Sequence, residues 1–303
     1  MKAKDYALAL LVITVWGLNF VVIKLTMQSM PPMLIVTLRY ALIALPLLPF
    51  VKRPPIKLRW LALYAIMLGT VHQGLLFLGI KAGMGAGLSS LVLQTQVFFT
   101  LGFAAIFLKE KIRPQQIAGM ALAGVGLYLI ATATDHSSNL LAFTLMIGSA
   151  VTWAIATMFS KHASNTATGP IEPLSFMVWA AVFPPLPTFA LSLLIDGPAA
   201  IVAGVQALTL PTVAGLAFIT YGSTLLGFVI WNMLIARHGA SHVTQFSLLV
   251  PVVGMSSAAL VLGENVPPLK AFAAGLILVG LMISMFGSHA VAFVTRRFVG
   301  TEA

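Results

Sequence analysis

Long apolar stretches alternate with short polar breaks along the whole chain. Each stretch has about the 20 residues that a helix needs to cross a bilayer, and Pro, Gly, Asp and Ser are frequent in the breaks. The pattern predicts ten membrane-spanning helices joined by short connections, so that neighbouring helices run antiparallel. The expected ranges are 6–26, 33–51, 60–80, 86–108, 114–133, 139–160, 173–195, 210–235, 243–262 and 269–288.

Two short sequence phrases occur twice, once in each half of the chain. The paired copies are Trp16–Lys24 with Trp153–Lys161, and Glu110, Pro114 and Gly126 with Glu264, Pro268 and Gly280. The repeat divides the spans into two sets of five, in units 1–136 and 137–303, the second with a short cytoplasmic tail. Because five is odd, the second unit enters the bilayer upside down. The predicted fold class is an all-α integral membrane protein with ten transmembrane helices as two inverted five-helix repeats, which is typical of transporters.

Composition restricts the class of protein further. Hydrophobic residues make up 59% of the 303 residues and charged residues only 8%, which excludes a soluble globular protein. Ten spans nearly exhaust the length, so no room remains for a soluble catalytic domain. The absence of Cys excludes disulfides and thiolate metal sites. Lys2 and Lys4 resemble the start of a secretory signal, but the apolar run continues to Ile23 without a clean cleavage site, which indicates an uncleaved first span.

The basic residues are distributed unevenly between the two sides of the predicted bundle. With a cytoplasmic N-terminus, one side carries Lys2, Lys4, Lys52, Arg53, Lys57, Arg59, Lys109, Lys111, Arg113, Lys161, Arg237, Arg296 and Arg297, and the other carries Lys24, Lys81 and Lys270. This bias predicts a multi-pass plasma membrane protein, in the inner membrane of a bacterium, with both termini in the cytoplasm. The net charge of +10 therefore reflects topology, and no nucleic-acid partner is expected.

Four phrases resemble a known family of membrane proteins. Phe107–Glu110 and Val261–Glu264 close the fourth and ninth spans as in the EamA type of the drug/metabolite transporter superfamily. Val15–Phe20 and Leu91–Thr100 look like the subgroup that exports O-acetylserine and cysteine. The resemblance implies a ten-helix exporter of amino acids or related metabolites, with a central cavity between the two halves.

The resemblance covers nearly the whole chain, from Asp5 to about Gly287. Two positions depart from the family pattern. Lys109 stands where the family favours Gly, which leaves the fold unaffected. Val97 stands where many members carry a Pro, which the second half retains as Pro251. The resemblance therefore does not imply that the fourth and ninth spans bend alike.

Few polar side chains lie within the predicted spans, where each needs a partner or a wet cavity. Asn19 shares a helical face with Trp16, so its amide is suited to a substrate beside an aromatic wall or, equally, to helix packing. His72 and Gln73 lie near the middle of the third span. The imidazole is placed to take a proton or bind a substrate carboxylate, and the alternative is a neutral His bonded to another helix.

Further candidates come from the second, fourth, sixth and eighth spans. Gln94 and Gln96 lie roughly 200° apart on a helix, so we expect only one of them, Gln94, to face the cavity. Arg39 lies about 10 Å into the second span. Snorkelling outward or capping a helix is favoured there over contact with a substrate carboxylate. The aromatic residues of the sixth and eighth spans wall the cavity or form an interfacial belt, and these are Trp153, Tyr221 and Trp231.

Acidic residues are confined to the ends of the spans or lie beyond them, so no carboxylate is placed to relay protons. Proton-driven export then requires His72, and the alternative is facilitated diffusion. Glu110 and Glu264 are expected to pair with nearby backbone or basic groups rather than to act as gates. His238 and His242 have a metal-like spacing but no carboxylate or thiol beside them, so neither a metal nor any other cofactor is expected.

These features favour a transporter that exports amino acids or related small neutral metabolites by alternating access. The alternative is a broad exporter of lipophilic or aromatic compounds. A membrane-embedded lipid enzyme is a remote third, because the chain lacks the phrases of known hydrolase sites. The expected partners are a small-molecule substrate and the lipid bilayer. The sequence leaves the oligomeric state open, and a monomer is compatible with it.

Overall fold

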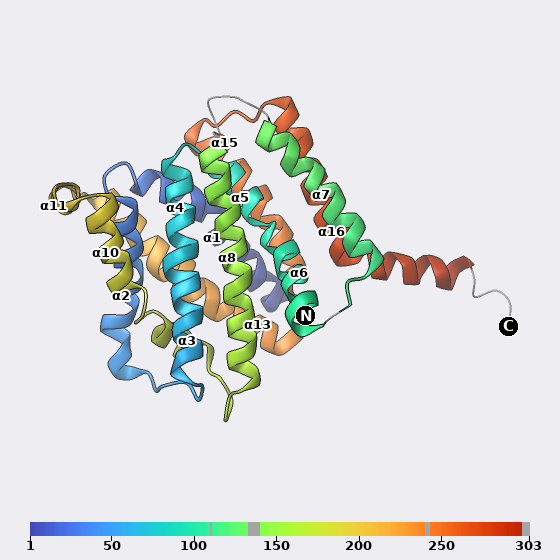
Figure 1. The fold of residues 1–303 in the computed structure, drawn as a ribbon, viewed down its shortest axis with the longest axis horizontal. Coiled ribbons are helices and arrows are strands. Elements are labelled where there is room, and N and C mark those ends of the chain that lie inside the picture. The colour runs from blue at the N-terminus through green and yellow to red at the C-terminus, as the bar shows by residue number, and fades with distance from the viewer. Residues whose placement is uncertain (110, 133–139, 240–242, 299–303) are drawn as a thin grey trace.

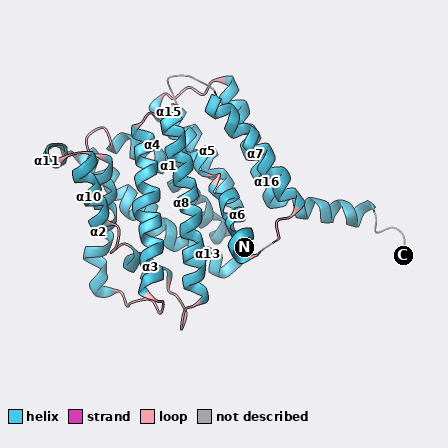
Figure 2. Ribbon diagram, in the orientation of Figure 1, coloured by secondary structure: helices cyan, strands magenta, loops and turns pink. Residues whose placement is uncertain are grey.

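The structure is a computed structural model that describes all residues except 110, 133–139, 240–242 and 299–303. Helices account for most of the described chain (Figure 2). Within these described residues, ten helical stretches are long and apolar enough to span a membrane, which confirms the ten predicted helices. They are Ala3–Thr26, Pro32–Phe50, Leu58–Lys81, Ala86–Phe107, Pro114–Thr132, Leu140–Asn165, Pro173–Ile195, Leu210–His238, Thr244–Leu262 and Pro268–Met285. The predicted boundary at 136/137 lies outside the described residues.

Several spans consist of more than one helical element (Figure 1). The first half contains α1 (Ala3–Thr26), α2 (Pro32–Leu47), η1 (Leu48–Phe50), α3 (Leu58–Ala65), η2 (Ile66–His72), α4 (Gln73–Lys81), α5 (Ala86–Leu93), α6 (Gln96–Leu108) and α7 (Pro114–Thr132). The second half contains α8 (Leu140–Asn165), α9 (Pro173–Ala180), α10 (Pro185–Ile195), α11 (Pro198–Gln206), α12 (Leu210–Ala217), η3 (Phe218–Leu226), α13 (Gly227–His238), η4 (Thr244–Leu249), α15 (Val250–Leu262) and α16 (Pro268–Phe298).

The third and eighth spans carry the same interruption. In each, an α-helix of eight residues, α3 or α12, leads into a π-helical segment, η2 or η3. A π-helix shifts the backbone hydrogen bonds by one residue and is frequent at functional sites. Because the two segments begin at equivalent positions, the inverted halves share this irregularity.

The fourth and ninth spans also break at equivalent positions. α6 and α15 each have 13 residues, and each follows a short irregular or 3₁₀ stretch. Pro251 is the second residue of α15, and Val97 is the second residue of α6. The break in the fourth span therefore forms without the Pro that the family pattern favours.

α7 and α16 lie side by side along one edge of the bundle (Figure 1). They approach so closely that a Cβ atom on Gly119 would lie 2.3 Å from the Gly280 carbonyl oxygen. A Cβ atom on Gly126 would lie 2.7 Å from the Ala273 carbonyl oxygen. Small residues thus let these two backbones touch, as they do at many membrane helix interfaces.

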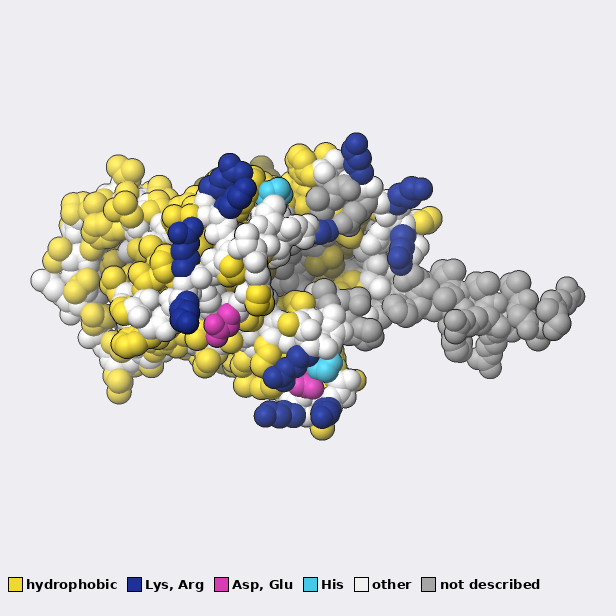
Figure 3. All heavy atoms as spheres, turned by 90° about the horizontal axis from the view of Figure 1, so that it is seen from below, with side chains coloured by type: hydrophobic (Ala, Val, Ile, Leu, Met, Phe, Trp, Pro, Cys, Tyr) yellow, Lys and Arg dark blue, Asp and Glu magenta, His cyan; other side chains and the backbone are white. Residues whose placement is uncertain are grey.

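The charged residues separate the two ends of the bundle. The end with the turns 51–57 and 166–172, seen from below in Figure 3, carries many Lys and Arg side chains and few acidic ones. We call this end the basic face; Lys57, Lys161 and Arg237 lie on it. The opposite face has the ion pairs Lys24–Glu264 at 2.7 Å and Lys81–Asp196 at 3.2 Å.

Candidate functional site

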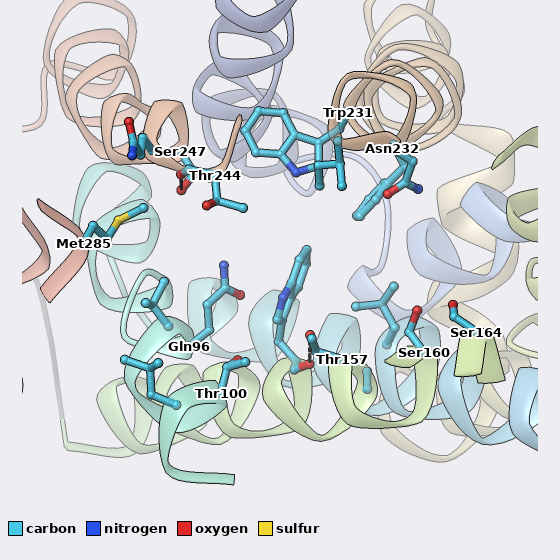
Figure 4. A pocket seen from close by; sticks show the side chains of 18 of the residues that line it. Gln96, Thr100, Thr157, Ser160, Ser164, Trp231, Asn232, Thr244, Ser247 and Met285 are labelled. Atoms are coloured by element: carbon cyan, nitrogen blue, oxygen red, sulfur yellow. Dashed lines mark hydrogen bonds between the residues drawn. The ribbon is translucent and has the colours of Figure 1, made fainter. Parts of the chain in front are cut away.

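A cavity of about 750 Å³ lies between the two halves of the chain. At its deep end it is lined by Trp16, Gln96 and Trp153. From there it extends to Arg113 and Ser164, near the helix ends of the basic face. Figure 4 shows neutral polar side chains around it, among them Thr157 and Asn232. The cavity is thus accessible from the basic face.

Aromatic rings from both halves form the inner wall of this cavity. The ring centroid of Trp16 lies 5.3 Å from that of Phe228 and 5.1 Å from that of Trp231. Trp153 stacks on Phe228 at 5.9 Å and meets the edge of His72 at 4.9 Å. These separations are typical of favourable aromatic pairs, so the rings hold one another in place.

The aromatic wall also shows the inverted symmetry. Trp16 donates from its indole Nε1 to the carbonyl oxygen of Ser223 in η3, at 3.0 Å. Its equivalent, Trp153, contacts His72, the last residue of η2. Each half therefore places its Trp against the π-helical segment of the other half.

A smaller recess of about 90 Å³ adjoins the deep end of the cavity. Trp16, Gln96 and Trp153 line both spaces. The recess is where most of the polar residues predicted from the sequence come together, namely Asn19, Arg39, His72, Gln73 and Gln94. They come from α1, α2, η2, α4 and the turn after α5.

Arg39 is buried in this recess, with 2% of its surface exposed. Its Nε donates to the hydroxyl of Thr224, and its Nη1 donates to the amide oxygen of Gln73 at 3.1 Å. The guanidinium also lies 5.9 Å from the centre of the Tyr40 ring. The interpretation of Arg39 as a snorkelling side chain is therefore wrong. Two neutral acceptors hold the guanidinium inward.

His72 is bonded to the sixth span. Its Nδ1 lies 2.8 Å from the hydroxyl oxygen and 2.9 Å from the carbonyl oxygen of Ser149. The Ser149 hydroxyl is also 3.0 Å from the carbonyl oxygen of His72. His72 thus has the interhelical bond that the structural alternative required, and it also lines the recess. Its contact with a substrate stays a prediction.

Two side-chain oxygens at the recess lack a hydrogen-bond partner among the described residues. They are Oδ1 of Asn19 and Oε1 of Gln96, and both atoms are buried. Nε2 of Gln94 donates to the carbonyl oxygen of Ser247 at 2.8 Å. Both Gln94 and Gln96 line the recess, whereas the larger cavity is lined by Gln96 and not by Gln94, so the prediction of Gln94 alone is wrong. The helix breaks between Leu93 and Gln96, so the angle expected for a continuous helix does not apply.

Of the three aromatic residues predicted to wall the cavity, Trp153 and Trp231 do line it, and Tyr221 lies elsewhere. Tyr221 is 38% exposed and donates its hydroxyl to the carbonyl oxygen of Leu42 at 3.0 Å. That carbonyl lacks its usual helical donor, because Pro46 four residues later has no N–H. The π-helical segment and this free carbonyl direct Tyr221 away from the site.

The prediction from the sequence did not include some residues of the site. Phe228 and Asn232 line the cavity together with Trp231. All three lie on α13 at spacings of three and four residues, which is the signal that would have found them. Thr224 and Ser149 became visible only through their contacts with Arg39 and His72.

At the opposite face the bundle is closed by α1, α5 and α15. A Cβ atom on Gly17 would lie 2.6 Å from Val253, and one on Gly254 would lie 2.4 Å from the Ser90 hydroxyl oxygen. Small residues let the three helices pack tightly at these crossings, and residues 86–92 of α5 and 251–262 of α15 line neither the cavity nor the smaller recess beside it. The cavity therefore opens at one face and is sealed at the other.

Glu264 joins the same three helices. Its carboxylate accepts bonds from Lys24 at 2.7 Å and from the backbone N–H groups of Ala86 at 2.8 Å and Gly87 at 3.1 Å. Burial raises the pKa of the Glu264 carboxyl group, but these donors outweigh burial and hold it below its usual value. The expected pairing of Glu264 with basic and backbone groups is confirmed. Glu110 lies outside the described residues.

His238, considered above for metal binding, lies at the basic face and contacts a carboxylate. Its Nε2 is 3.0 Å from Asp5, which also lies 3.6 Å from Arg237. This arrangement fastens the start of α1 to the end of α13. The second histidine of the pair, His242, lies outside the described residues.

The fold and the cavity together define a class of protein. Two inverted five-helix halves enclose an aromatic and polar cavity that is open to one face and closed to the other, as in a multi-pass membrane transporter. The sequence pattern of the EamA-like transporter family matches this chain twice, over residues 4–132 and 140–286, once in each half. The chain belongs to this family, and it is a transporter rather than an enzyme.

Individual relatives resemble the chain over almost its full length. It is 39% identical over 289 residues to a probable amino-acid metabolite efflux pump of Escherichia coli strain K12, covering 95% of this chain and 96% of the relative. It is 28% identical over 286 residues to a probable terminal-alkyne amino-acid exporter of Streptantibioticus cattleyicolor, covering 92% of each. A solved crystal structure with 16% identity covers 96% of this chain and 99% of its own, with a TM-score of 0.60. That likeness supports the fold alone.

Proposed function

We propose that this transporter exports amino acids or related small neutral metabolites by alternating access. The observation that carries the proposal is the cavity of about 750 Å³, which is open at the basic face and sealed at the opposite one. Its wall combines aromatic rings with neutral polar groups, which suits a small solute with both polar and apolar parts. The names of the two relatives, an amino-acid metabolite pump and an amino-acid exporter, support the same substrate class.

The direction follows from the charge distribution. The basic face lies in the cytoplasm under the positive-inside rule, with both termini on that side of a bacterial inner membrane. The open cavity then loads from the cytoplasm. Release requires α1, α5 and α15 to separate at the opposite face while the basic face closes.

Counterflow in proteoliposomes tests the proposal. Purified protein is reconstituted, loaded with an unlabelled amino acid, and supplied with a trace of the same labelled compound, across a panel of amino acids and with or without a pH gradient. We expect labelled amino acids to accumulate transiently. Because the described spans hold no carboxylate near the cavity, the pH gradient should change this little. Absence of counterflow with every amino acid would refute the proposal.

The orientation is tested separately in this Cys-free chain. Lys57→Cys lies at the basic face and Lys81→Cys at the opposite face, and both residues are exposed. In intact cells, an impermeant thiol reagent should label the Lys81 variant and leave the Lys57 variant unlabelled until the membrane is opened. The reverse pattern would place the termini outside.

A broad exporter of lipophilic or aromatic compounds is the second candidate, and the aromatic wall of Trp16, Trp153, Phe228 and Trp231 favours it. The buried Arg39 next to that wall argues against lipophilic cations, because like charges repel strongly in a poorly solvated site. Competition in the same counterflow assay distinguishes the two. Aromatic cations should compete if this second function holds and should not if the chain selects amino acids.

A further inference from the structure

The recess and the cavity differ in size and in chemistry. The recess holds about 90 Å³, and its lining includes Arg39, Gln73 and Asn19. The cavity is about 750 Å³, and its wall combines aromatic rings with Thr, Ser, Gln and Asn side chains. A small polar head group fits the recess, while a variable side chain needs the larger space.

Arg39 lacks an acidic partner among the described residues. Its Nε and Nη1 donate to the hydroxyl of Thr224 and the amide of Gln73, both neutral. A guanidinium has five N–H donors, so further donors remain for a ligand. Because a charge within a membrane protein is costly without a counter-ion, an anion that reaches the recess gains a strong interaction. A carboxylate matches the fork of the guanidinium in a bidentate pair.

The same recess offers unused acceptors. Oδ1 of Asn19 and Oε1 of Gln96 are buried and have no hydrogen-bond partner among the described residues. Asn19 as a whole is 9% exposed. A ligand that donates a hydrogen bond to such a buried acceptor is stabilised, and an ammonium group has three N–H donors. One cation and two free acceptors therefore complement a group that has both a carboxylate and an ammonium.

We propose that the recess binds the head group of the transported amino acid, with its carboxylate on Arg39 and its ammonium near Asn19 and Gln96. The side chain then points into the wide cavity between Trp16 and Trp153. This inference rests on the proposed function and adds the orientation of the substrate. It follows that the transporter selects strictly for the carboxylate and loosely for the side chain.

The test compares three competitors of labelled amino-acid counterflow, namely the free amino acid, its carboxamide and its decarboxylated amine. For the wild-type protein we expect the carboxamide and the amine to compete about ten- to a hundredfold more weakly, since each loses a charged hydrogen bond. In Arg39→Gln the three competitors should become nearly equal. Arg39→Lys, which keeps the charge but not the fork, should retain part of the preference.

Tyr221→Phe is the matched control, because Tyr221 lies outside the cavity and the recess. It should keep the wild-type preference. If Arg39→Gln is not recovered as folded protein, Asn19→Asp gives the same information. That variant adds an anion beside the ammonium position, where it also competes with the substrate carboxylate for Arg39, so the preference for the free amino acid over the amine should fall.

The outcomes separate the two proposals. Wild-type counterflow of amino acids with no discrimination against the carboxamide overturns the role of Arg39 and leaves amino-acid export standing. An unchanged preference in Arg39→Gln or Asn19→Asp does the same. If no amino acid is carried by the wild-type protein, the proposed function itself fails.

Discussion

At the scale of single residues, the irregular backbone of η3 and the indole of Trp16 depend on each other. A π-helical segment leaves carbonyl groups outside the regular α-helical bonding pattern. The Ser223 carbonyl in η3 accepts a hydrogen bond from the indole Nε1 of Trp16 at 3.0 Å. The same indole thus walls the cavity and stabilises the π-helical segment behind it.

We therefore expect Trp16→Phe to destabilise the protein. The substitution keeps an aromatic ring but removes the N–H group and with it the hydrogen bond to the Ser223 carbonyl, at a cost of about 0.5–1.5 kcal/mol. The measurement is the midpoint of thermal unfolding in detergent. Trp153→Phe is the control, because Trp153 contributes ring contacts to the same wall. Equal losses in the two variants would show that the indole N–H does not matter.

At the scale of helical elements, the sequence predicted the spans well and their interruptions poorly. Hydrophobicity is a local property, so apolar stretches such as Ala3–Thr26 and Pro173–Ile195 appear in the sequence within a few residues of their observed ends. The π-helical segments η2 and η3 carry no comparable local pattern and lie where other helices pack against them.

The misplaced site residues have the same origin. The angle expected between Gln94 and Gln96 assumes a regular helix, and Tyr221 is predicted from its span alone, yet each of them lies in or beside an interruption. Arg39 was placed by its depth alone, whereas its direction depends on Thr224 from the other half of the chain. Contacts between distant residues, rather than local pattern, decide these orientations.

Glu264 links three elements, which makes its protonation a test of how they are held together. Its pKa is below the usual value of 4.5 in the folded protein, because Lys24 and two backbone N–H groups stabilise the carboxylate against the effect of burial. A depressed pKa contributes stability that is fully present above the unfolded pKa and is lost as pH falls through the folded pKa.

We expect Glu264→Gln to be less stable than the wild type at pH 7. The difference should shrink as the pH drops from about 4.5 to below the folded pKa, where the wild-type carboxylate also becomes neutral. Unfolding in detergent at a series of pH values measures this. Lys81→Gln is the control, because it removes only the exposed partner of an ion pair. Asp196→Gln would not serve, because Asp196 also accepts a backbone hydrogen bond. A difference independent of pH would contradict the role assigned to the Glu264 carboxylate.

At the scale of the whole molecule, the two halves enclose a cavity that is open at the basic face and closed at the opposite face. The closed end is held by contacts of α1 and α5 with α15, so the inverted halves meet there. An ideal Cβ atom on Gly87 would lie 3.4 Å from the Cβ of Ala258, close to the separation found in disulfides. Since α5 and α15 belong to different halves, a bond between these positions would tie the halves together at the opposite face.

In this Cys-free chain, the double variant Gly87→Cys with Ala258→Cys tests whether the closed end must open. Under oxidising conditions we expect counterflow to stop, because α5 and α15 cannot separate, while binding of the amino acid from the basic face persists. A reducing agent should restore counterflow, since Gly87 keeps its backbone N–H for Glu264 after substitution. The two single-Cys variants control for the substitutions themselves and should transport equally with or without oxidant. If the oxidised double variant carried substrate as fast as the reduced one, the route would not pass between these helices, and alternating access by separation of the two halves at this face would be wrong.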